Sequence, residues 1–420
     1  MNILVIGGGG REHTIVKQLK KSSKVKKIYC APGNAGIAAD AVCIPEISAL
    51  DIPAVVGWAS QNPVDLVFVA PDDPLAAGMV DALENAGIAA FGPSRLAAEI
   101  EGSKVFSKDL MKKYSIPTAE YEVFENPDDA VKYISSSGKY PVVIKADGLA
   151  LGKGVIIAEN EEQAQKAVHE IMQDKIFGDS GNRVVVEEFL TGPEVSVLAF
   201  TDGKTVVPMV SSKDHKRAFD GDKGPNTGGM GTISPNPHYT EDIAKTCMET
   251  IFQPTVDAMA KEGRPFKGVL YFGLMLTGDG VKVIEYNARF GDPEAQVVLP
   301  RLKTDFLDIL EAVMEERLSE IDIQWSDEAC ACVIMASGGY PGSYPKGVVI
   351  NGLDDNGQVE NAVVYHAATV YEDSQFKTNG GRVLGVTGIA ENLEDALKCA
   401  YDAVDKISFD GAMYRKDIGR

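Results

Sequence analysis

Cysteine, tryptophan and basic residues are scarce in this sequence. Its 420 residues include six cysteines, two tryptophans, and 41 lysines and arginines against 61 aspartates and glutamates. Six cysteines scattered along so long a chain do not make a disulfide framework and fit a reduced protein. The formal net charge of −20 excludes a broad basic face, so we expect no binding to nucleic acid.

Long apolar runs are absent as well. The sequence contains no stretch of 18 apolar residues, which predicts that it has no membrane span. Met1–Ile6 leads directly into an expected strand and a glycine turn, without the cationic and apolar segments of a signal peptide. We therefore expect a cytoplasmic protein. We also expect it to be a monomer.

Apolar residues and glycine, in contrast, are plentiful. Hydrophobic residues make up 45% of the chain, which excludes disorder as its main state. The length suggests two to four domains at about 150 residues each. The 42 glycines exceed the usual share of about 7%, and many of them gather in a few short segments.

The first hundred residues alternate between strand and helix patterns. Apolar strands are expected at 2–6, 66–69 and 88–91. Before the last of these strands, Asp73 is a suitable N-cap, Pro74 suits the first helical position and Gly87 suits the helix stop. This spacing predicts a doubly wound parallel sheet in an N-terminal domain of residues 1–102.

The pattern changes after residue 102. Residues 103–328 are expected to form a second α+β domain, with a small flap unit over about 122–192. In this domain we expect a helix at 104–114, strands at 141–146, 155–158 and 184–188, a helix at 161–172, a long loop at 214–231, and a hairpin of 269–277 with 281–286. Residues 329–420 make a small C-terminal α+β domain, so the expected fold class is multidomain α/β.

Gly7–His13 follows a strand and opens a helix. Glycines there let an anion approach the backbone, and the free amides of a helix start favour negative charge. The dinucleotide fingerprint needs a third glycine where this chain has Glu12. We predict a phosphate-binding turn rather than an NAD site, with a tight turn alone as the alternative.

Lys145–Gly154 is a second glycine-rich segment, and it lies between two expected strands. It does not match the P-loop pattern. A glycine-rich hairpin can close over a triphosphate, with backbone amides and the lysines Lys145 and Lys153 meeting the charge. The alternative is a surface hairpin without a ligand.

Ile284–Glu294 carries a third candidate group. Side chains two apart in an extended chain share a face, so Glu285 and Asn287 point the same way, and Arg289 could continue that face. A carboxylate and a carboxamide suit magnesium, which leaves room for waters and phosphates. Arg289 would grip a carboxylate or a phosphate. The alternative is an exposed face with a weak Glu–Arg pair.

Other segments give weaker signals. The 214–231 loop is long enough to be functional, and its surroundings include four cations, Lys213, Lys216, Arg217 and Lys223. Histidines other than His215 show no paired arrangement, so we assign them core or surface roles. Cys330 and Cys332 are expected to be two buried strand residues rather than a metal site.

Taken together and in this order, these segments resemble the phosphoribosylamine–glycine ligase family of the ATP-grasp superfamily over essentially the whole chain. The matching segments are Gly9–His13, Ala31–Gly36, Phe91–Pro93, Glu101–Lys104, Lys145–Gly154, Asp214–Arg217, Gly224–Gly231, Glu285–Glu294, Thr378–Val383 and Arg415–Gly419. The resemblance implies a pre-ATP-grasp domain, a two-part ATP-grasp fold and a small C-terminal domain.

The resemblance also implies a reaction of purine biosynthesis. ATP would phosphorylate the carboxylate of glycine, and the amine of 5-phosphoribosylamine would attack the acyl phosphate. The products would be glycinamide ribonucleotide, ADP and phosphate, with Mg²⁺ or Mn²⁺ as the metal. The protein would mainly position reactants and neutralise charge.

The resemblance assigns roles to residues. Those implied at ATP are Lys104, Lys145, Gly152, Lys153 and Gly154 for phosphates, Glu187, Glu188, Phe189 and Leu190 for adenine, and Glu194 for ribose. Those implied elsewhere are Glu285 and Asn287 for metal, Asp214, Lys216 and Arg289 at the reacting centre, and Gly9, Gly10, Arg11, Asn34, Asp72, Asp292, Pro293 and Glu294 for the other substrates.

The chain departs from the family pattern at three places. Asp72 stands where the family has a glutamate, one methylene longer, while Tyr286 and Ala295 replace a phenylalanine and a threonine. Two other functions remain at this stage. One is a different ATP-grasp carboxylate–amine ligase, against which the 214–231 loop and Arg415–Gly419 argue. The other is a non-catalytic nucleotide-binding protein, which would be free to lose the proposed metal ligands.

Overall fold

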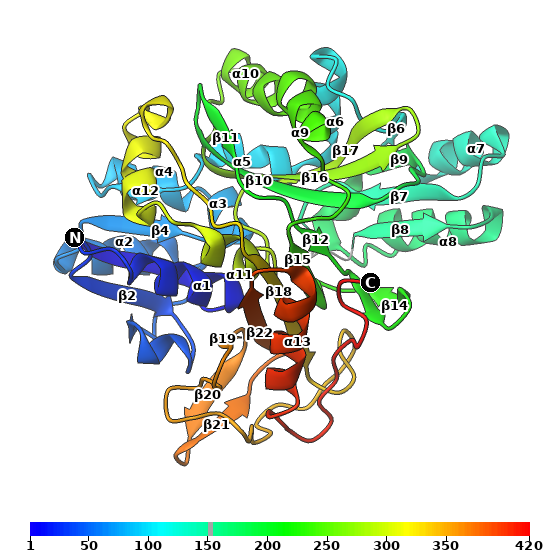
Figure 1. The fold of residues 1–420 in the computed structure, drawn as a ribbon. Helices are drawn as coiled ribbons and strands as arrows, with labels where there is room; N and C mark the ends of the chain where they lie inside the picture. The colour runs from blue at the N-terminus through cyan, green and yellow to red at the C-terminus, as the bar shows by residue number, and fades with distance from the viewer. Residues whose placement is uncertain (150–153) are drawn as a thin grey trace.

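The computed structural model describes residues 1–149 and 154–420. The N-terminal part, the flap unit and the C-terminal part extend in different directions from a shared centre (Figure 1). Among the helices of these residues, none is both long and apolar enough to cross a membrane.

The N-terminal part is a parallel five-stranded sheet of order β3-β2-β1-β4-β5, as predicted. Its strands are β1 Asn2–Gly7, β2 Lys27–Pro32, β3 Val42–Cys43, β4 Leu66–Val69 and β5 Ala90–Phe91. Its helices are α1 Gly10–Leu19, a 3₁₀ turn Ile37–Ala39, α2 Ile52–Gln61, α3 Asp72–Ala76, α4 Met79–Asn85 and α5 Arg95–Gly102. The strand order reverses at β1, which places the glycine turn where such sheets bind ligands.

The helix predicted before Gly87 differs in detail. It begins two residues early, because the extended Pro71 occupies the N-cap position and Asp73 lies inside the first turn. The prediction of Asp73 as N-cap is therefore wrong. Gly78 has φ of +88° and divides the segment into α3 and α4. Gly87, at φ +75°, follows the helix as predicted.

The flap unit is an antiparallel sheet of order β6-β9-β7-β8 with its own buried core. Its elements are β6 Tyr121–Phe124, α7 Pro127–Ser137, β7 Val142–Ala146, β8 Val155–Ala158, α8 Glu161–Met172, a 3₁₀ turn Gly178–Asn182 and β9 Val184–Glu188. The edge strand β8 faces the centre of the molecule (Figure 1).

A second antiparallel sheet, of order β11-β10-β16-β17, forms the body of the central domain. Its elements are α6 Lys104–Lys113, β10 Glu194–Asp202, β11 Val206–Pro208, α9 Glu241–Cys247, a π-helical turn Met248–Phe252, α10 Gln253–Lys261, β16 Lys267–Thr277 and β17 Gly280–Asn287. The hairpin of β16 and β17 confirms the prediction. It is followed by α11 Ala295–Val298, 3₁₀ turns Leu299–Arg301 and Leu318–Glu320, and α12 Phe306–Met314.

The long loop predicted at 214–231 is partly wrong, because the segment contains strands. These are β12 Lys213–Asp214, β13 Arg217–Phe219, β14 Lys223–Asn226 and β15 Gly231–Ser234. β13 and β14 form a hairpin that turns at Gly221 and Asp222, both with positive φ. Asp220-Gly221 is the sequence signal for such a turn, and its charged surroundings obscured it.

The C-terminal sheet has the order β12-β15-β18-β22-β19, so two of its strands precede residue 329. Its other elements are β18 Ala329–Ala336, β19 Val363–His366, the hairpin of β20 Thr369–Glu372 with β21 Gln375–Thr378, β22 Arg382–Ala390 and α13 Leu393–Val404. Cys330 and Cys332 are buried free thiols on β18, as expected.

Candidate active site

The glycine turn after β1 and the segment after β17 meet at the centre of the molecule. The guanidinium of Arg11 donates from Nη1 to the carbonyl of Phe290 at 3.1 Å. A Cβ placed on Gly9 or Gly10 would lie 3.6 Å from the carboxylate of Asp292. The structure thus brings together the Gly9–Arg11 and Asp292 predictions, 280 residues apart in the chain.

The turn itself is not a ring of free amides. The amide of Gly9 donates to Oε2 of Glu12 at 2.6 Å, while Oε1 of Glu12 accepts from Nε of Arg11 at 2.7 Å. This bond from the N-cap amide to the Glu12 side chain uses a donor that we had expected to meet an anion. The expectation of a free Gly9 amide is wrong, and Arg11 is the cation that remains at this turn.

Asn34 holds the protein together rather than offering its side chain to a substrate. Its amide nitrogen donates to the carbonyls of Gly8 and His366, both at 2.8 Å. Its amide oxygen accepts from the amides of Gly36 and Ile37, both at 2.9 Å. Two donors and two acceptor sites exhaust a carboxamide, so a contact of Asn34 with the phosphoribosyl group would have to come from its backbone, and its role at the substrate stays a prediction.

The histidines include a pair that the sequence did not indicate. Nδ1 of His13 accepts from the amide of His366 at 2.9 Å, and the two rings lie 5.7 Å apart. Burial lowers the pKa of both imidazoles. The expected core role is confirmed, but the expectation of no paired arrangement is wrong. This pair joins α1 to β19.

A buried carboxylate stands between two lysines where the flap meets β17. Oε1 of Glu187 lies 2.9 Å from Nζ of Lys145, and Oε2 lies 2.9 Å from Nζ of Lys108. Lys145 also donates to the carbonyl of Ile284 at 3.1 Å. Burial lowers the pKa of Lys108 to about 8, against the opposing effect of Glu187. Lys108 was not predicted, because nothing in its helix distinguishes it from surface lysines.

The remaining residues expected at ATP lie around this group. Nζ of Lys104 donates to the carbonyl of Gly148 at 2.9 Å, which joins α6 to the glycine-rich segment. Gly154 accepts from the amide of Ala146 at 2.8 Å. Gly152 and Lys153 lie outside the described residues.

The segment expected at adenine continues β9. The amide of Glu188 donates to the carbonyl of Glu120 at 2.9 Å. The carboxylate of Glu188 lies 3.4 Å from Nζ of Lys282. Phe189 and Leu190 follow the end of the strand. Their peptide groups are therefore better placed than those within β9 to meet an adenine edge.

Glu285 and Asn287 lie half-buried on one face of the end of β17, while Tyr286 is buried on the other. Nζ of Lys216 lies 3.4 Å from Glu285 and 3.4 Å from Glu194. Lys216 lowers the pKa of Glu285 to about 2, so this carboxylate is ionised.

The face of β17 fits a cation that shares its coordination with a ligand. Within the described residues, no three His, Cys, Asp or Glu side chains form a metal cage. Two hard oxygen donors on a half-open face suit a magnesium-like ion that keeps its other positions for water and phosphate.

Arg289 does not extend the strand face, because β17 ends at Asn287. Its Nη2 lies 2.8 Å from Glu101 and 3.5 Å from Asp72. Glu101 is buried and also accepts from the amide of Ala288 at 2.7 Å. Nε of Arg289 is buried without a hydrogen-bond partner among the described residues, and remains available for an anionic group. Glu101 was not predicted as a site residue, although it lies in a segment that matches the family.

Two carboxyl groups, those of Asp214 and Glu294, lie at the same centre as the cationic side chains. Burial and the nearby Glu294 raise the pKa of Asp214 well above its usual range, and burial raises that of Glu294. A Cβ at Gly229 would lie 2.7 Å from Asp214 and 2.4 Å from Pro293. The predicted residues of the two loops therefore lie on either side of one glycine.

The C-terminal domain contributes Arg382, which was not predicted as a site residue. Its Nη1 donates to the carbonyls of Gly228 and Asp292, both at 2.6 Å. One guanidinium on β22 thus ties together the two loops that carry Asp214 and Glu294.

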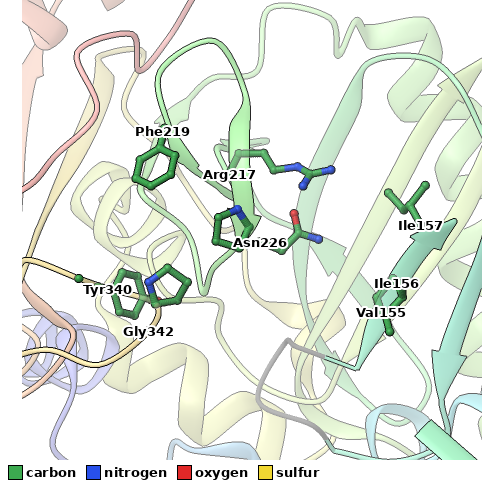
Figure 2. A pocket seen from close by; sticks show the side chains of 11 residues that line it. Val155, Ile156, Ile157, Arg217, Phe219, Asn226, Tyr340 and Gly342 are labelled. Atoms are coloured by element: carbon green, nitrogen blue, oxygen red, sulfur yellow. The ribbon is translucent and has the colours of Figure 1, made fainter. Parts of the chain in front are cut away.

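A cavity of about 680 Å³ opens beside this centre, between β8, the hairpin β13–β14 and the loop of Tyr340. In Figure 2, Arg217 and Asn226 lie close together on its hairpin wall, with Ile157 across from them. The hydroxyl of Tyr340 accepts from the amide of Gly228 at 3.2 Å. The cavity therefore adjoins the loop that Arg382 holds.

Three family models match the chain in sequence. They are the phosphoribosylglycinamide synthetase N domain over residues 1–101, its ATP-grasp (A) domain over 102–295 and its C domain over 330–420. The chain is 49% identical to a phosphoribosylamine–glycine ligase of Caldanaerobacter subterraneus, covering 100% of this chain and 99% of the relative. It is 50% identical to the same-named protein of Halalkalibacterium halodurans, covering 100% and 96%.

Comparison with solved structures agrees with these sequence matches. A phosphoribosylamine–glycine ligase from Thermotoga maritima superposes with a TM-score of 0.88 at 32% identity, covering 100% of both chains. A biotin carboxylase domain from Hydrogenobacter thermophilus, solved with MgADP, shares the fold with a TM-score of 0.74 at 15% identity, covering 98% of this chain and 91% of that one. With its three domains matched in order along its whole length, the chain belongs to the phosphoribosylglycinamide synthetase family of ATP-grasp ligases.

Proposed function

We propose that this chain joins the carboxyl group of glycine to the amino group of 5-phosphoribosylamine, while ATP is cleaved to ADP and phosphate. The observation that carries the proposal is the full-length identity of about half with proteins named for this reaction. The site supports it, because cations and carboxylates suited to phosphate and amine chemistry converge at one centre.

The lysines prepare the site for a nucleotide. Lys104 and Lys145 would neutralise phosphate oxygens, and Glu187 holds Lys145 in place from behind. Phe189 and Leu190 would meet adenine through their peptide groups, and Glu194 would hold the ribose. Lys216 lies between Glu194 and Glu285, so it reaches from the nucleotide side to the reacting centre.

Glu285 and Asn287 would hold Mg²⁺, or Mn²⁺, which supplies charge neutralisation to the phosphates when bound. Arg289 offers its free Nε to the carboxylate or phosphate of the acyl phosphate. A carboxylate becomes an electrophile once phosphate is its leaving group, so alignment of the incoming amine is the main demand on the protein. Asp214 and Glu294, whose pKa values are raised by burial, would accept a proton from that amine.

The amine substrate would lie near the glycine turn. Arg11, Asp72 and Asp292 border this side of the centre, and Arg289 with Arg11 lowers the pKa of Asp72 against the effect of burial. An ionised Asp72 would bind a hydroxyl or amine rather than a phosphate.

Release of ADP tests the proposal. The protein is incubated with ATP, magnesium, glycine and freshly prepared 5-phosphoribosylamine, and each component is omitted in turn. We expect ADP release that requires both glycine and the amine. Release with bicarbonate or formate in place of glycine would assign the chain to a different ATP-grasp ligase, and no release in any mixture would indicate a non-catalytic protein.

A further inference from the structure

Arg415 is a buried arginine near the end of the chain, outside the groups assigned above. Its side chain is 2% exposed. Its Nη1 donates to Asp222 at 2.7 Å and to the carbonyl of Arg217 at 3.2 Å. Its Nε and Nη2 donate to the two oxygens of Asp417 at 2.7 and 2.9 Å. A single guanidinium therefore joins the segment Arg415–Gly419 to the hairpin β13–β14.

Backbone groups strengthen this junction at the hairpin turn. The amide of Gly221 donates to Asp417 at 2.7 Å, and the amide of Lys416 donates to Asp220 at 2.8 Å. Together with the Arg415–Asp222 bond, each residue of the turn is held by the C-terminal segment. Without the guanidinium, three aspartates would face one another there, because Asp220, Asp222 and Asp417 all approach this point.

The far end of the same segment holds His215. The amide of Gly419 donates to Nε2 of His215 at 3.1 Å, and Nδ1 of that ring pairs with the carbonyl of Gly231 at 3.2 Å. Nδ1 therefore carries the proton and Nε2 accepts. His215 is the residue between Asp214 and Lys216 in the sequence, so the orientation of its backbone determines the positions from which both neighbouring side chains extend.

The segment can act as a support because it is itself anchored. Ile418 is 2% exposed, and its side chain packs so closely under Gly231 that a Cβ there would lie 2.6 Å from it. The hydroxyl of Tyr401, on α13, donates to the carbonyl of Arg415 at 2.9 Å and accepts from the amide of Ile418 at 3.1 Å.

The hairpin needs such a support. A two-stranded hairpin is at best marginally stable alone, and β13 and β14 make a separate two-stranded sheet. At its tip Phe219 is 51% exposed, so little apolar burial fixes it. The hairpin also forms one wall of the cavity in Figure 2.

We propose that Arg415–Gly419 is a positioning element of the reaction centre, in which Arg415 fixes the hairpin and Gly419 fixes His215, and through them Asp214 and Lys216. This inference rests on the proposed function and assigns a catalytic task to the C-terminal domain. In this proposal Arg415 is a positioning residue, because its guanidinium is bonded to Asp222, Asp417 and the carbonyl of Arg217.

The test compares Arg415→Met with Lys416→Met. Both variants lose one positive charge from adjacent positions, but the side chain of Lys416 is exposed and only its amide holds the hairpin. In Arg415→Met the side chain of Asp222 is 73% exposed and can be solvated, whereas Asp417, 20% exposed, keeps the amide of Gly221 as a donor. A misplacement of about 1 Å costs about 100-fold in rate, so we expect kcat to fall about 10- to 100-fold in Arg415→Met. The KM for ATP should change much less than kcat, because the proposed phosphate ligands Lys104 and Lys145 are held by Gly148 and Ile284, although Lys216 also pairs with Glu194.

Hydrogen exchange supplies the second measurement. Amides of residues 217–226 should exchange faster in Arg415→Met, while those of the N-terminal sheet and the flap stay protected, and Lys416→Met should match the unaltered protein in both measurements. Asp417→Asn, which keeps Arg415, should show the same local change in smaller degree and serves if Arg415→Met does not fold.

Three results would overturn the proposal. The first is an unchanged kcat in Arg415→Met although the amides of 217–226 exchange faster. The second is unchanged exchange in 217–226. The third is an equal loss of protection from exchange across the whole chain. If the unaltered protein releases no glycine-dependent ADP, the proposed function fails and the catalytic part of this inference fails with it, whereas local exchange in 217–226 still decides whether the segment holds the hairpin.

Discussion

Lys108 offers a test of how the interior behind the flap tolerates charge. Its side chain is 2% exposed, and its ammonium shares Glu187 with Lys145. The pKa of Lys108 falls from 10.5 to about 8 on burial, and this difference corresponds to about 3 kcal/mol. The folded protein thus binds this proton more weakly than the unfolded chain, and the charged lysine costs stability at neutral pH.

Nζ of Lys108 also donates to the hydroxyl of Thr118 at 2.7 Å, a hydrogen bond worth about 1 kcal/mol. We therefore expect Lys108→Met to leave the free energy of unfolding unchanged or to raise it by up to about 2 kcal/mol at pH 7, because removal of the desolvation cost outweighs loss of this bond. Glu187 keeps Lys145 as its partner. Glu187→Gln is the opposite case, because it leaves two buried lysines facing a neutral amide, and should cost about 3–5 kcal/mol.

Denaturant unfolding at a series of pH values measures both effects. Stability of the unaltered protein should rise relative to Lys108→Met as pH increases from 8 to 10.5, since over this range the unfolded chain holds the proton and the folded protein does not. Parallel pH curves for the two proteins would refute the reasoning. So would a loss of stability in Lys108→Met as large as that in Glu187→Gln.

Three further outcomes are expected. Glu285→Ala should abolish ADP release at any practical magnesium concentration, and a variant with the rate of the unaltered protein would exclude Glu285 as a metal ligand. Asp72→Ala should raise the KM for 5-phosphoribosylamine, and an unchanged KM would show that this shorter carboxylate is not a ligand. Burial lowers the pKa of His215 to about 4, so the unfolded chain binds a proton that the folded protein does not bind between about pH 6.5 and 4. The free energy of unfolding should therefore fall by up to about 3 kcal/mol over this range. Denaturant unfolding of His215→Gln beside the unaltered protein should show no such loss.

Elements with strong local patterns could be predicted from the sequence. The bounds of β4, β8, β9 and α8 agree with the predicted ranges, because short apolar runs mark the strands and composition marks the helix locally. Glu285 and Asn287 share a face as predicted, since alternation holds at the end of β17, after a register irregularity between Val283 and Glu285. These predictions needed no partner from elsewhere in the chain.

Some errors were local, at the Asp73 cap and in the 214–231 loop, whereas other contacts could not be predicted because they join distant partners. Asn34 meets a carbonyl of His366, and Arg382 meets carbonyls of Gly228 and Asp292, at separations of 332, 154 and 90 residues. Nothing in the sequence around Asn34 or Arg382 indicates that its side chain will bond to these distant backbone carbonyls. Motif resemblance brought the right segments to attention, but only coordinates distinguish a residue that contacts a substrate from one that holds the backbone beside it.

The mixed origin of the C-terminal sheet determines how the molecule can be divided. β15, from residues 231–234, pairs with β18 from residue 329 onward, so a cut near residue 328 would separate two hydrogen-bonded neighbours. The released fragment would expose one edge of β18, and the remainder would keep β15 paired with β12 but open on the edge toward β18, and such open edges invite aggregation. Exchange of C-terminal regions between relatives should therefore carry residues 213–234 along with 329–420, so that donor and acceptor each keep a complete sheet.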